Sequence, residues 1–444
     1  MDKNFTESLA AQAATHGFTD WEVYQHMSNQ FSVSVFEGQI KEYKVTASAS
    51  LNFRGTLHGR MGYANTENFS PEIIPTLLAH AATHAGLIEE DEPEKLFPGS
   101  AAYPTVDTYN SALNETTAAE KIALALALEA ACKTADPRVT TVDYCYIGSG
   151  EETLHMANSY GLDVQHTGNY GMAYVSACVT CPTTGEVKTH GDHWEGRDFA
   201  ALDVQALART TVAGALAQLG AAPAESGCFP VVLENRAVCA LFGAFNGVFF
   251  AENAQKGFSL LAGKEGETIA APCVTLRDDG VCPHSLHSAP FDGEGVATQQ
   301  TTVIENGVLR TLLYNTKSAA KAGKQSTGNA SRGNSIGTTC TNFYLSPGET
   351  PPEVLRSGIT HGLLINRFSG LHAGTNAISG DFSLLAGGFF IEDGQISRPV
   401  DQITLSGNIF SLLQNIREVA SDLHFEWNTG MPSLRVDGLQ VSGV

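Results

Sequence analysis

Apolar residues recur every three or four positions in several segments of the chain, a spacing that buries one face of a helix. The longer segments of this kind are predicted to be helices, and they span residues 3–16, 71–86, 118–135, 202–219 and 236–250. Shorter helical stretches are expected at residues 255–261, 316–323 and 410–423. Ser70 and Thr117 stand where N-caps belong, and Asp136-Pro137 is expected to end the third helix.

Apolar and polar residues alternate over residues 21–64 and 140–194, and over most of the chain after Thr275, which predicts strands. Glycine-bearing positions divide these strands. Turns are expected at Glu37-Gly38, Arg54-Gly55, Gly148-Ser149-Gly150, Tyr160-Gly161 and Thr183-Thr184-Gly185. The pair Asn306-Gly307 favours a two-residue type I′ hairpin turn. The chain is therefore expected to be rich in antiparallel hairpins.

A change in composition marks a domain boundary near the middle of the chain. Residues 220–227 are rich in Ala and Pro, and the predicted domains are residues 1–222 and 226–444. An acidic, proline-bearing stretch at residues 89–104 is expected to be a loop or linker. The predicted fold class is α+β, with a mixed N-terminal domain of helices and β-hairpins. A largely antiparallel, barrel-like β domain follows it.

Charge and cysteine content narrow the class of protein. The 444 residues include 26 basic and 47 acidic side chains, a net charge of −21. Such a field repels the phosphate backbone and no basic cluster offsets it, so we expect no nucleic-acid partner. No apolar run is long enough to predict a membrane span. The nine cysteines are scattered and odd in number, and the N-terminus is polar, so the expected location is the cytoplasm.

Glycine-rich blocks in the second half follow one another in a distinctive order. They include Phe291-Asp292-Gly293-Glu294-Gly295, Ser326-Thr327-Gly328-Asn329-Ala330-Ser331-Arg332-Gly333, and the segments at residues 374–383, 388–396 and 432–443. In this order the blocks resemble the C-terminal half of the TldD/PmbA family. Proteins of that family are described as modulators of DNA gyrase and as metallopeptidases.

One local motif separates the two branches of that family. The TldD-like branch carries His-Glu-x-x-x-His on a helix, whose histidines share a zinc ion and whose glutamate can act as general base. Counted back from Lys256-Gly257, the motif would begin at Phe242, but the chain reads Phe242-Gly243-Ala244-Phe245-Asn246-Gly247. A thiolate ligand near the C-terminus is also missing, because the last cysteine is Cys340. The chain therefore resembles the PmbA (TldE-like) branch, and neither a metal ligand nor a catalytic residue is expected in it.

The resemblance implies a role in a two-component peptidase. This chain would pair with a TldD-like metallopeptidase subunit, which would bind the zinc. It would shape the chamber that holds unfolded peptides, and it would form a homodimer when alone. Two other hypotheses stay open: a stand-alone homodimeric peptide- or ligand-binding protein without a hydrolytic role, and a peptidase with an unrecognised site.

Several histidines and cysteines have spacings that suit metal or redox chemistry. They are His80 with His84, His190 with His193 and Glu195, Cys282 with His284 and His287, and Cys178 with Cys181. The helical pair lacks an intervening glutamate and a third ligand. The Cys-x-x-Cys pair ends a predicted strand, whereas a redox pair opens a helix. A structural role is the favoured interpretation of each group.

A last set of polar residues is predicted to bind substrate: Asn329, Arg332, Asn376, Ser379 and Asp381. They lie among apolar strand residues, where an unpaired polar group is costly. They are expected either to line a peptide groove or to hydrogen-bond local turns. An exposed strand edge beside them would bind an extended peptide through its main chain, with broad sequence tolerance.

Overall fold

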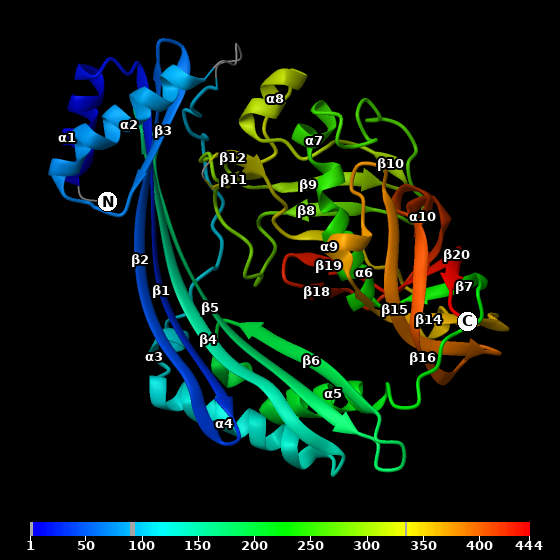
Figure 1. The fold of residues 1–444 in the computed structure, drawn as a ribbon. Coiled ribbons are helices and arrows are strands. Elements are labelled where there is room, and N and C mark those ends of the chain that lie inside the picture. Colours follow the sequence, from blue (N-terminus) through cyan, green and yellow to red (C-terminus); the bar gives the residue numbers. More distant parts are fainter. Residues whose placement is uncertain (1–2, 89–93, 334) are drawn as a thin grey trace.

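The computed structural model describes residues 3–88, 94–333 and 335–444, and its first half is built on one long, curved antiparallel sheet (Figure 1). The strands run in the order β3-β2-β1-β4-β5-β6. They are β1 (Asp20–Phe36), β2 (Gln39–Leu57), β3 (Arg60–Thr66), β4 (Val139–Asn158), β5 (Asp163–Thr180) and β6 (Val187–Gly196).

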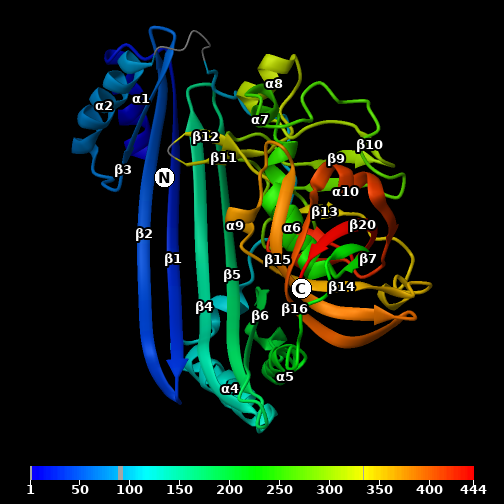
Figure 2. The same cartoon turned by 45° about the vertical axis from the view of Figure 1, so that its right-hand side comes forward.

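Helices cover one face of this sheet at both ends, and we call it the outer face. They are α1 (Lys3–Thr15), α2 (Ile74–Leu87), α4 (Ala118–Ala135) and α5 (Val204–Leu216). The pair α1 and α2 packs on Val23 and Phe53. The pair α4 and α5 packs on Ile147 and Val175. The other face, which we call the inner face, looks toward the second half of the chain (Figure 2).

The second half contains a small barrel. Its strands run in the order β16-β15-β14-β7-β20, and β16 also pairs with β20, which closes the barrel. The strands are β7 (Gly227–Leu233), β14 (His361–Ser369), β15 (Asp381–Glu392), β16 (Gln395–Asn408) and β20 (Leu434–Ser442), with β17 (Ile416–Val419) beside β20. Val231, Ile365 and Leu405 from these strands share one core with helix α6 (Asn235–Phe245).

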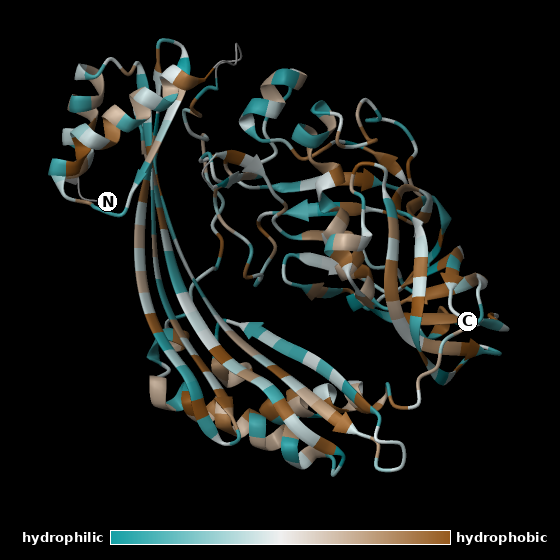
Figure 3. Ribbon diagram, viewed as in Figure 1, coloured by the Kyte–Doolittle hydropathy of each residue, from teal (hydrophilic) through white to brown (hydrophobic). Residues whose placement is uncertain are grey.

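A second sheet of short strands lies against this core, in the order β10-β9-β8-β13-β19-β18. Its strands are β8 (Leu276–Asp279), β9 (Gln300–Glu305), β10 (Val308–Leu309), β13 (Phe343–Leu345), β18 (His424–Glu426) and β19 (Thr429–Met431). The hairpin β11 (Ala330–Arg332) and β12 (Ile336–Thr338) projects toward the long sheet (Figure 1). Short helices complete this half, namely α7 (Ala251–Gln255), α8 (Thr316–Ala322), α9 (Leu371–Gly374) and α10 (Ile409–Asn415), while α3 (Ser111–Glu115) belongs to the first half. Hydrophobic positions gather in the C-terminal core and where the long strands lie on α4 and α5 (Figure 3).

Two turns predicted inside the long strands are wrong. Arg54-Gly55 lies within β2, and the chain reverses instead at His58-Gly59, whose φ angles are 53° and 79°. Gly148-Ser149-Gly150 lies within β4. These glycines make room for aromatic rings rather than turning the chain. A β-carbon on Gly55 would lie 2.8 Å from the ring of Phe18, and one on Gly148 would lie 2.7 Å from the ring of Tyr146.

The other turns and most helices agree with the sequence patterns. Asn306 and Gly307 have φ angles of 48° and 83°, as a type I′ turn requires. Thr117 caps α4 through a complete capping box with Glu120. Ser70 makes no side-chain cap bond, because the predicted helix begins as a 3₁₀ turn over Pro71–Ile73.

Three predicted helices end elsewhere. Helix α6 stops at Phe245, before residue 250, and a 3₁₀ turn follows over Asn246–Phe249. The helix expected at 255–261 does not form, because turns and irregular backbone follow Gln255. Helix α7 lies just upstream and ends at that residue. Helix α10 stops at Asn415, because Ile416–Val419 pair with β20 as strand β17.

The predicted α+β class is confirmed, with a helix-and-hairpin first half and a barrel-containing second half. The proposed domain boundary, between residues 222 and 226, falls between α5 and β7. Part of the predicted linker, residues 89–93, lies outside the described residues. No helix in the described part of the chain has the length and apolar character needed to span a membrane.

Candidate functional site

Arg332, at the end of β11, reaches from the second half of the chain to the long sheet. Its Nη1 donates to Glu22 Oε1 at 2.5 Å and to the Gly293 carbonyl oxygen at 3.2 Å. Its guanidinium lies 5.0 Å from the ring centre of Tyr24. Arg332 Nη2 is buried and has no partner among the described residues. This predicted substrate residue therefore forms part of the contact between the two halves.

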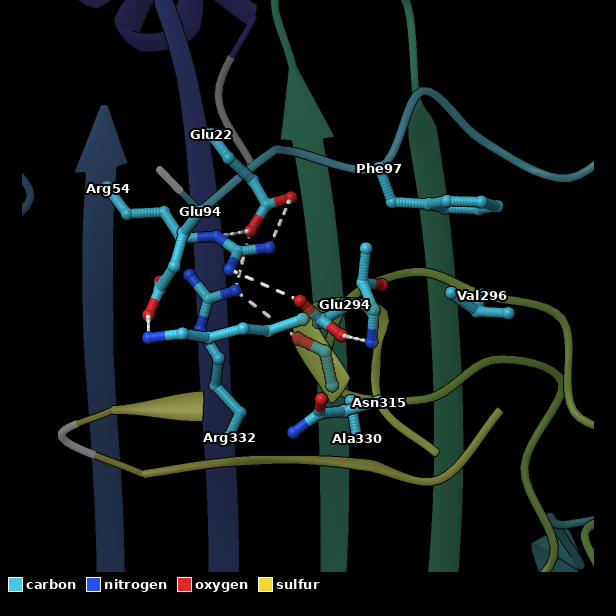
Figure 4. Close-up of polar contacts among 12 residues, drawn as sticks. Glu22, Arg54, Glu94, Phe97, Glu294, Val296, Asn315, Ala330 and Arg332 are labelled. Carbon is cyan, nitrogen blue, oxygen red and sulfur yellow. Dashed lines mark hydrogen bonds and ion pairs between the residues drawn. The ribbon is translucent and has the colours of Figure 1, made fainter. Parts of the chain in front are cut away.

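Arg332 belongs to a group of four buried charges, which we call the ion cluster: Glu22, Arg54, Glu294 and Arg332 (Figure 4). Arg54 Nε donates to Glu22 Oε1 at 2.7 Å, and Arg54 Nη1 lies 3.6 Å from Glu294 Oε1. These side chains are between 0% and 4% exposed. Burial raises the pKa of Glu22, but the charges of Arg54 and Arg332 outweigh it and leave the pKa below its usual value. The cluster therefore carries ionised groups away from water, where pairing is essential.

Asn329 is buried directly before strand β11, three residues ahead of Arg332, and is fully occupied by neighbours. Its Nδ2 donates to Asp278 Oδ2 at 2.7 Å and to the Thr339 carbonyl oxygen at 3.0 Å. Burial raises the pKa of Asp278 to about 6. Asn329 thus holds the loop that carries Arg332, and the structure brings these two predicted residues together.

Asp292 fixes the glycine-rich loop beside the ion cluster. Its carboxylate accepts hydrogen bonds from the backbone N–H groups of Glu294, Val296 and Ala330 at 2.9, 3.0 and 2.9 Å. Burial, with the nearby charge of Glu294, raises the pKa of Asp292 to about 7, although these three donors favour its ionised form. The loop therefore places Glu294 beside Arg54. Glu294 Oε2 also accepts a hydrogen bond from the backbone N–H of Thr316 at 2.8 Å.

Asn376, Ser379 and Asp381 lie together in one turn at the start of barrel strand β15. Asn376 Oδ1 accepts from the backbone N–H groups of Ile378 and Ser379 at 3.0 and 3.2 Å. Asp381 Oδ1 accepts from Asn408 Nδ2 at 2.9 Å. Asn376 and Asp381 are exposed, so they hydrogen-bond their own turn and also meet solvent.

A cluster that the sequence did not single out as a unit joins β6, β18 and α6. Arg236 Nη1 donates to Asp192 Oδ1 at 2.7 Å, and Arg236 Nε lies 3.2 Å from Glu426 Oε1. His193 lies 3.7 Å from the other oxygen of Glu426 and stacks on Trp427 with ring centres 5.5 Å apart. Asp192, which lies between His190 and His193 in the sequence, is therefore held by an arginine. No alternation or spacing signals such a contact, because its members are far apart in the chain.

Two cavities follow the inner face of the long sheet. One, of about 710 Å³, is lined by Tyr24, His26, Glu152 and Arg332, among others. The other, of about 190 Å³, lies between Tyr170 of β5 and His287 of the second half. Glu152 and Leu154 line both cavities, so the two are neighbours along the sheet. The strand patterns predicted these strands but not which residues would face the second half.

Family models match almost the whole chain. The PmbA/TldA metallopeptidase C-terminal domain matches residues 226–443, the central domain matches residues 112–219, and domain 1 matches residues 21–84. The chain belongs to the PmbA/TldD metallopeptidase family. The resemblance drawn from the glycine-rich blocks is thereby confirmed.

Relatives within the PmbA/TldD family align over nearly their full length. The metalloprotease PmbA of Escherichia coli O157:H7 is 25% identical, over 98% of this chain and 95% of its own. The solved structure of TldE from Thermococcus kodakarensis is 25% identical with a TM-score of 0.89, and covers 99% of this chain and 100% of its own. A solved Thermotoga maritima MSB8 protein, whose name relates it to modulation of a DNA gyrase, is 30% identical. Its TM-score is 0.92, with both chains covered completely.

The name of the PmbA/TldD metallopeptidase family implies a metal ion, and the zinc motif of its TldD-like branch would lie on helix α6 and the turn after it. Phe242 is 1% exposed and packs in the C-terminal core. Gly243 and Gly247 have no side chains, and the carbonyl oxygen of Gly247 accepts from Asn253 Nδ2 at 2.8 Å. These positions supply no nitrogen, oxygen or sulfur side-chain ligand, so they do not fit zinc. Among the described residues, no group of three or more His, Cys, Asp or Glu side chains is placed to hold a metal ion.

Proposed function

We propose that this chain is the PmbA/TldE-like, non-catalytic subunit of a two-component metallopeptidase that acts on unfolded peptides. The observation that carries the proposal is the Phe242–Gly247 segment, which has neither ligands nor a general base. The zinc and the hydrolytic step would belong to a TldD-like partner. The similarity to TldE of Thermococcus kodakarensis supports the same division of roles.

Within that system, this chain would shape the space in which a peptide is held. The ion cluster ties Glu22 and Arg54 of the long sheet to Arg332 and Glu294 of the second half. That tie keeps the inner face of the sheet opposite the second half, with the two neighbouring cavities between them. A peptide lying there would meet a rigid wall, since both sides are held by buried pairs.

Arg332, Asn376, Ser379 and Asp381 remain proposed substrate contacts, whereas Asn329 is buried and would act by holding the loop of Arg332. Asp381 gives the sharpest test of the substrate contacts. In a reconstituted complex, Asp381→Ala should weaken binding of basic peptides if the carboxylate faces the substrate. If Asp381 only accepts from Asn408, the variant should lower the unfolding temperature and leave peptide preference unchanged. Asp381→Asn is the matched variant, because it removes the charge and keeps an oxygen that can accept from Asn408.

The free edge of the long sheet supports a proposed homodimer when the chain is alone. Strand β3 pairs with Leu51–Leu57 of β2, so residues 39–50 of β2 form an edge that β3 does not cover. Tyr43 and Val45 on this edge are 49% and 68% exposed. Unpaired edges with apolar side chains readily pair with another chain. The same edge would suit a TldD-like partner, and we expect both assemblies in the cytoplasm.

The decisive experiment mixes this chain with a purified TldD-like protein and follows cleavage of an unstructured peptide. We expect cleavage by the mixture and not by either protein alone, with zinc only in the partner. A partner variant without its motif glutamate serves as the control for contaminating peptidase. Cleavage by this chain alone, retained after repurification and insensitive to metalloprotease inhibitors, would refute the non-catalytic role. A lone chain that binds peptide and never assembles with the partner would favour the stand-alone binding protein instead.

A further inference from the structure

Four tyrosines lie on the inner face of the long sheet, toward the end that α4 and α5 cover from outside. Tyr144 and Tyr146 come from β4, and Tyr170 and Tyr174 from β5, and we call the four the tyrosine floor. Tyr146 stands directly opposite Tyr174 in the sheet register. Tyr144 stacks on Tyr146 at 6.3 Å and meets the edge of Tyr174 at 5.7 Å between ring centres.

Glycines beneath the rings shape this floor. A β-carbon on Gly148 would lie 2.7 Å from Cζ of Tyr146, and one on Gly150 would lie 2.6 Å from Cζ of Tyr170. On the edge strand, a β-carbon on Gly191 would lie 2.8 Å from Cζ of Tyr174. Each ring therefore lies across bare backbone instead of standing up between side chains, and it turns one face away from the sheet. Rings held in this way are preorganised for stacking.

The floor opens toward the second half of the chain. Tyr170 and Glu152 line the 190 Å³ cavity together with His287. Arg197 holds the loop of His287 in place. Its Nε donates to the carbonyl oxygen of Thr108 at 2.9 Å, and its Nη2 donates to the carbonyl oxygen of Ser285 at 2.9 Å. The floor thus borders, at Tyr170, a small cavity that the second half of the chain walls on its other side.

Stacking surfaces of tyrosine suit two kinds of flexible polymer, single-stranded nucleic acid and extended polypeptide. The net charge of −21 opposes a phosphate backbone. Because the second half of the chain faces the floor at Tyr170, an extended segment can reach the rings more readily than a folded second copy can. The chemistry therefore favours a polypeptide that offers flat or apolar side chains to the rings.

We propose that the tyrosine floor binds extended polypeptide segments by stacking on their aromatic and proline side chains. This inference rests on the proposed function, because it supplies the substrate preference of the same inner-face site. It adds a selectivity that main-chain pairing alone would not give. An aromatic contact of this kind increases the affinity for the peptide by about 3- to 10-fold.

The test uses the full chain and two labelled, unstructured ten-residue peptides of Gly and Ser. One carries two central tryptophans and the other carries two central alanines, and fluorescence anisotropy measures both dissociation constants. We expect the tryptophan peptide to bind at least about 3-fold more tightly, and Tyr146→Leu and Tyr174→Leu each to remove most of that difference. Tyr160→Leu is the matched control, because Tyr160 is 55% exposed in the turn after β4. Gly148→Ala should act like Tyr146→Leu by displacing the ring, and Tyr146→Phe should retain binding.

Equal affinity for the two peptides, or floor variants that bind as the unmodified chain does, would overturn the inference. So would a change of oligomeric state in Tyr146→Leu without a change in peptide affinity, or tighter binding of single-stranded oligothymidine than of either peptide. Circular dichroism of each variant separates lost binding from lost folding. Selective peptide binding together with an inactive reconstituted mixture would retain the floor and refute the peptidase role. Cleavage by the mixture without any aromatic selectivity would support the peptidase role and refute the binding role of the tyrosine floor.

Discussion

Glu22 is the residue on which the ion cluster depends, because it receives both Arg54 and Arg332. It is 0% exposed, and both guanidinium partners are also buried. Removing one partner of a buried ionic group costs far more than the pair itself contributes, since the remaining charges lose their compensation. The residue is therefore expected to matter for stability rather than for chemistry.

Glu22→Gln should lower the free energy of unfolding by about 3–5 kcal/mol, because two buried arginines would share a neutral amide. Urea unfolding followed by circular dichroism measures it. Since the pKa of Glu22 is lowered on folding, its contribution is present above the ordinary carboxyl pKa and is lost as pH falls through the lower, folded pKa. The gap between variant and unmodified chain should therefore close in acid. Glu42→Gln, on an exposed pair with Lys44, should leave stability nearly unchanged, and a similar loss there would contradict the assignment.

Asp292 should show the opposite pH dependence. Its pKa is raised to about 7 by burial, so the folded state holds its proton between about pH 4 and pH 7 while the unfolded state does not. The contribution of this group to stability therefore falls as pH rises through that window, by about 1.4 kcal/mol per pH unit. Unfolding free energies of the unmodified chain and Asp292→Asn should accordingly converge by about 2–3 kcal/mol between pH 5 and pH 8. A difference that is constant with pH would show that the three backbone donors keep Asp292 ionised throughout.

Among the elements, helix α6 illustrates what sequence patterns can establish. Its apolar spacing predicted a helix, and the Phe242–Gly247 segment predicted the loss of a zinc motif. Its end could not be foreseen, because Phe245 is held by the core while the chain turns at Asn246–Phe249. Glycines in β2 and β4 misled in the same way. Glycine is needed at these positions because a neighbouring ring, such as that of Tyr146, occupies the space of a side chain. The placement of that ring depends on the tertiary structure, so the sequence pattern does not show it.

Contacts between distant elements were also beyond the reach of sequence patterns. Arg332 was singled out as a polar residue in a glycine-rich loop, but its partner Glu22 lies on the first strand of the chain. Asn376 and Asp381 are close in the sequence, and the structure places them in one turn. Local hydrogen bonding is readable over a few residues, whereas pairing across hundreds of residues requires the fold.

Because α6 supplies no ligand, the purified chain should contain no stoichiometric zinc. Elemental analysis after dialysis against a weak chelator measures this, with a TldD-like protein as the positive control. About one tightly bound zinc per chain would contradict the expectation and would direct attention to His80 and His84 of α2. Loss of that metal in His84→Ala would then identify the ligands.

At the scale of the whole molecule, assembly is expected to depend on the edge of β2. Light scattering of the lone chain should show a particle about twice the 47.1 kDa monomer mass. Val45→Lys should shift it toward the monomer, because a lysine on an edge strand opposes pairing. Leu87→Lys, which is equally a surface change at the end of α2, should leave the dimer intact. A monomer at micromolar concentration, both alone and with a TldD-like protein, would exclude the proposed assembly.

The closure of the barrel sets a constraint on biosynthesis. Strand β7, at Gly227–Leu233, is the first barrel strand to leave the ribosome, and its neighbour β20, at Leu434–Ser442, is the last. At ordinary rates of translation about 10–40 s separate the two. During that interval the apolar residues of β7 and α6 lack part of their final surroundings, while every strand of the long sheet has already been synthesised. The barrel therefore cannot close until β20 has left the ribosome, and its exposed apolar strands make this half the part of the nascent protein most in need of a chaperone.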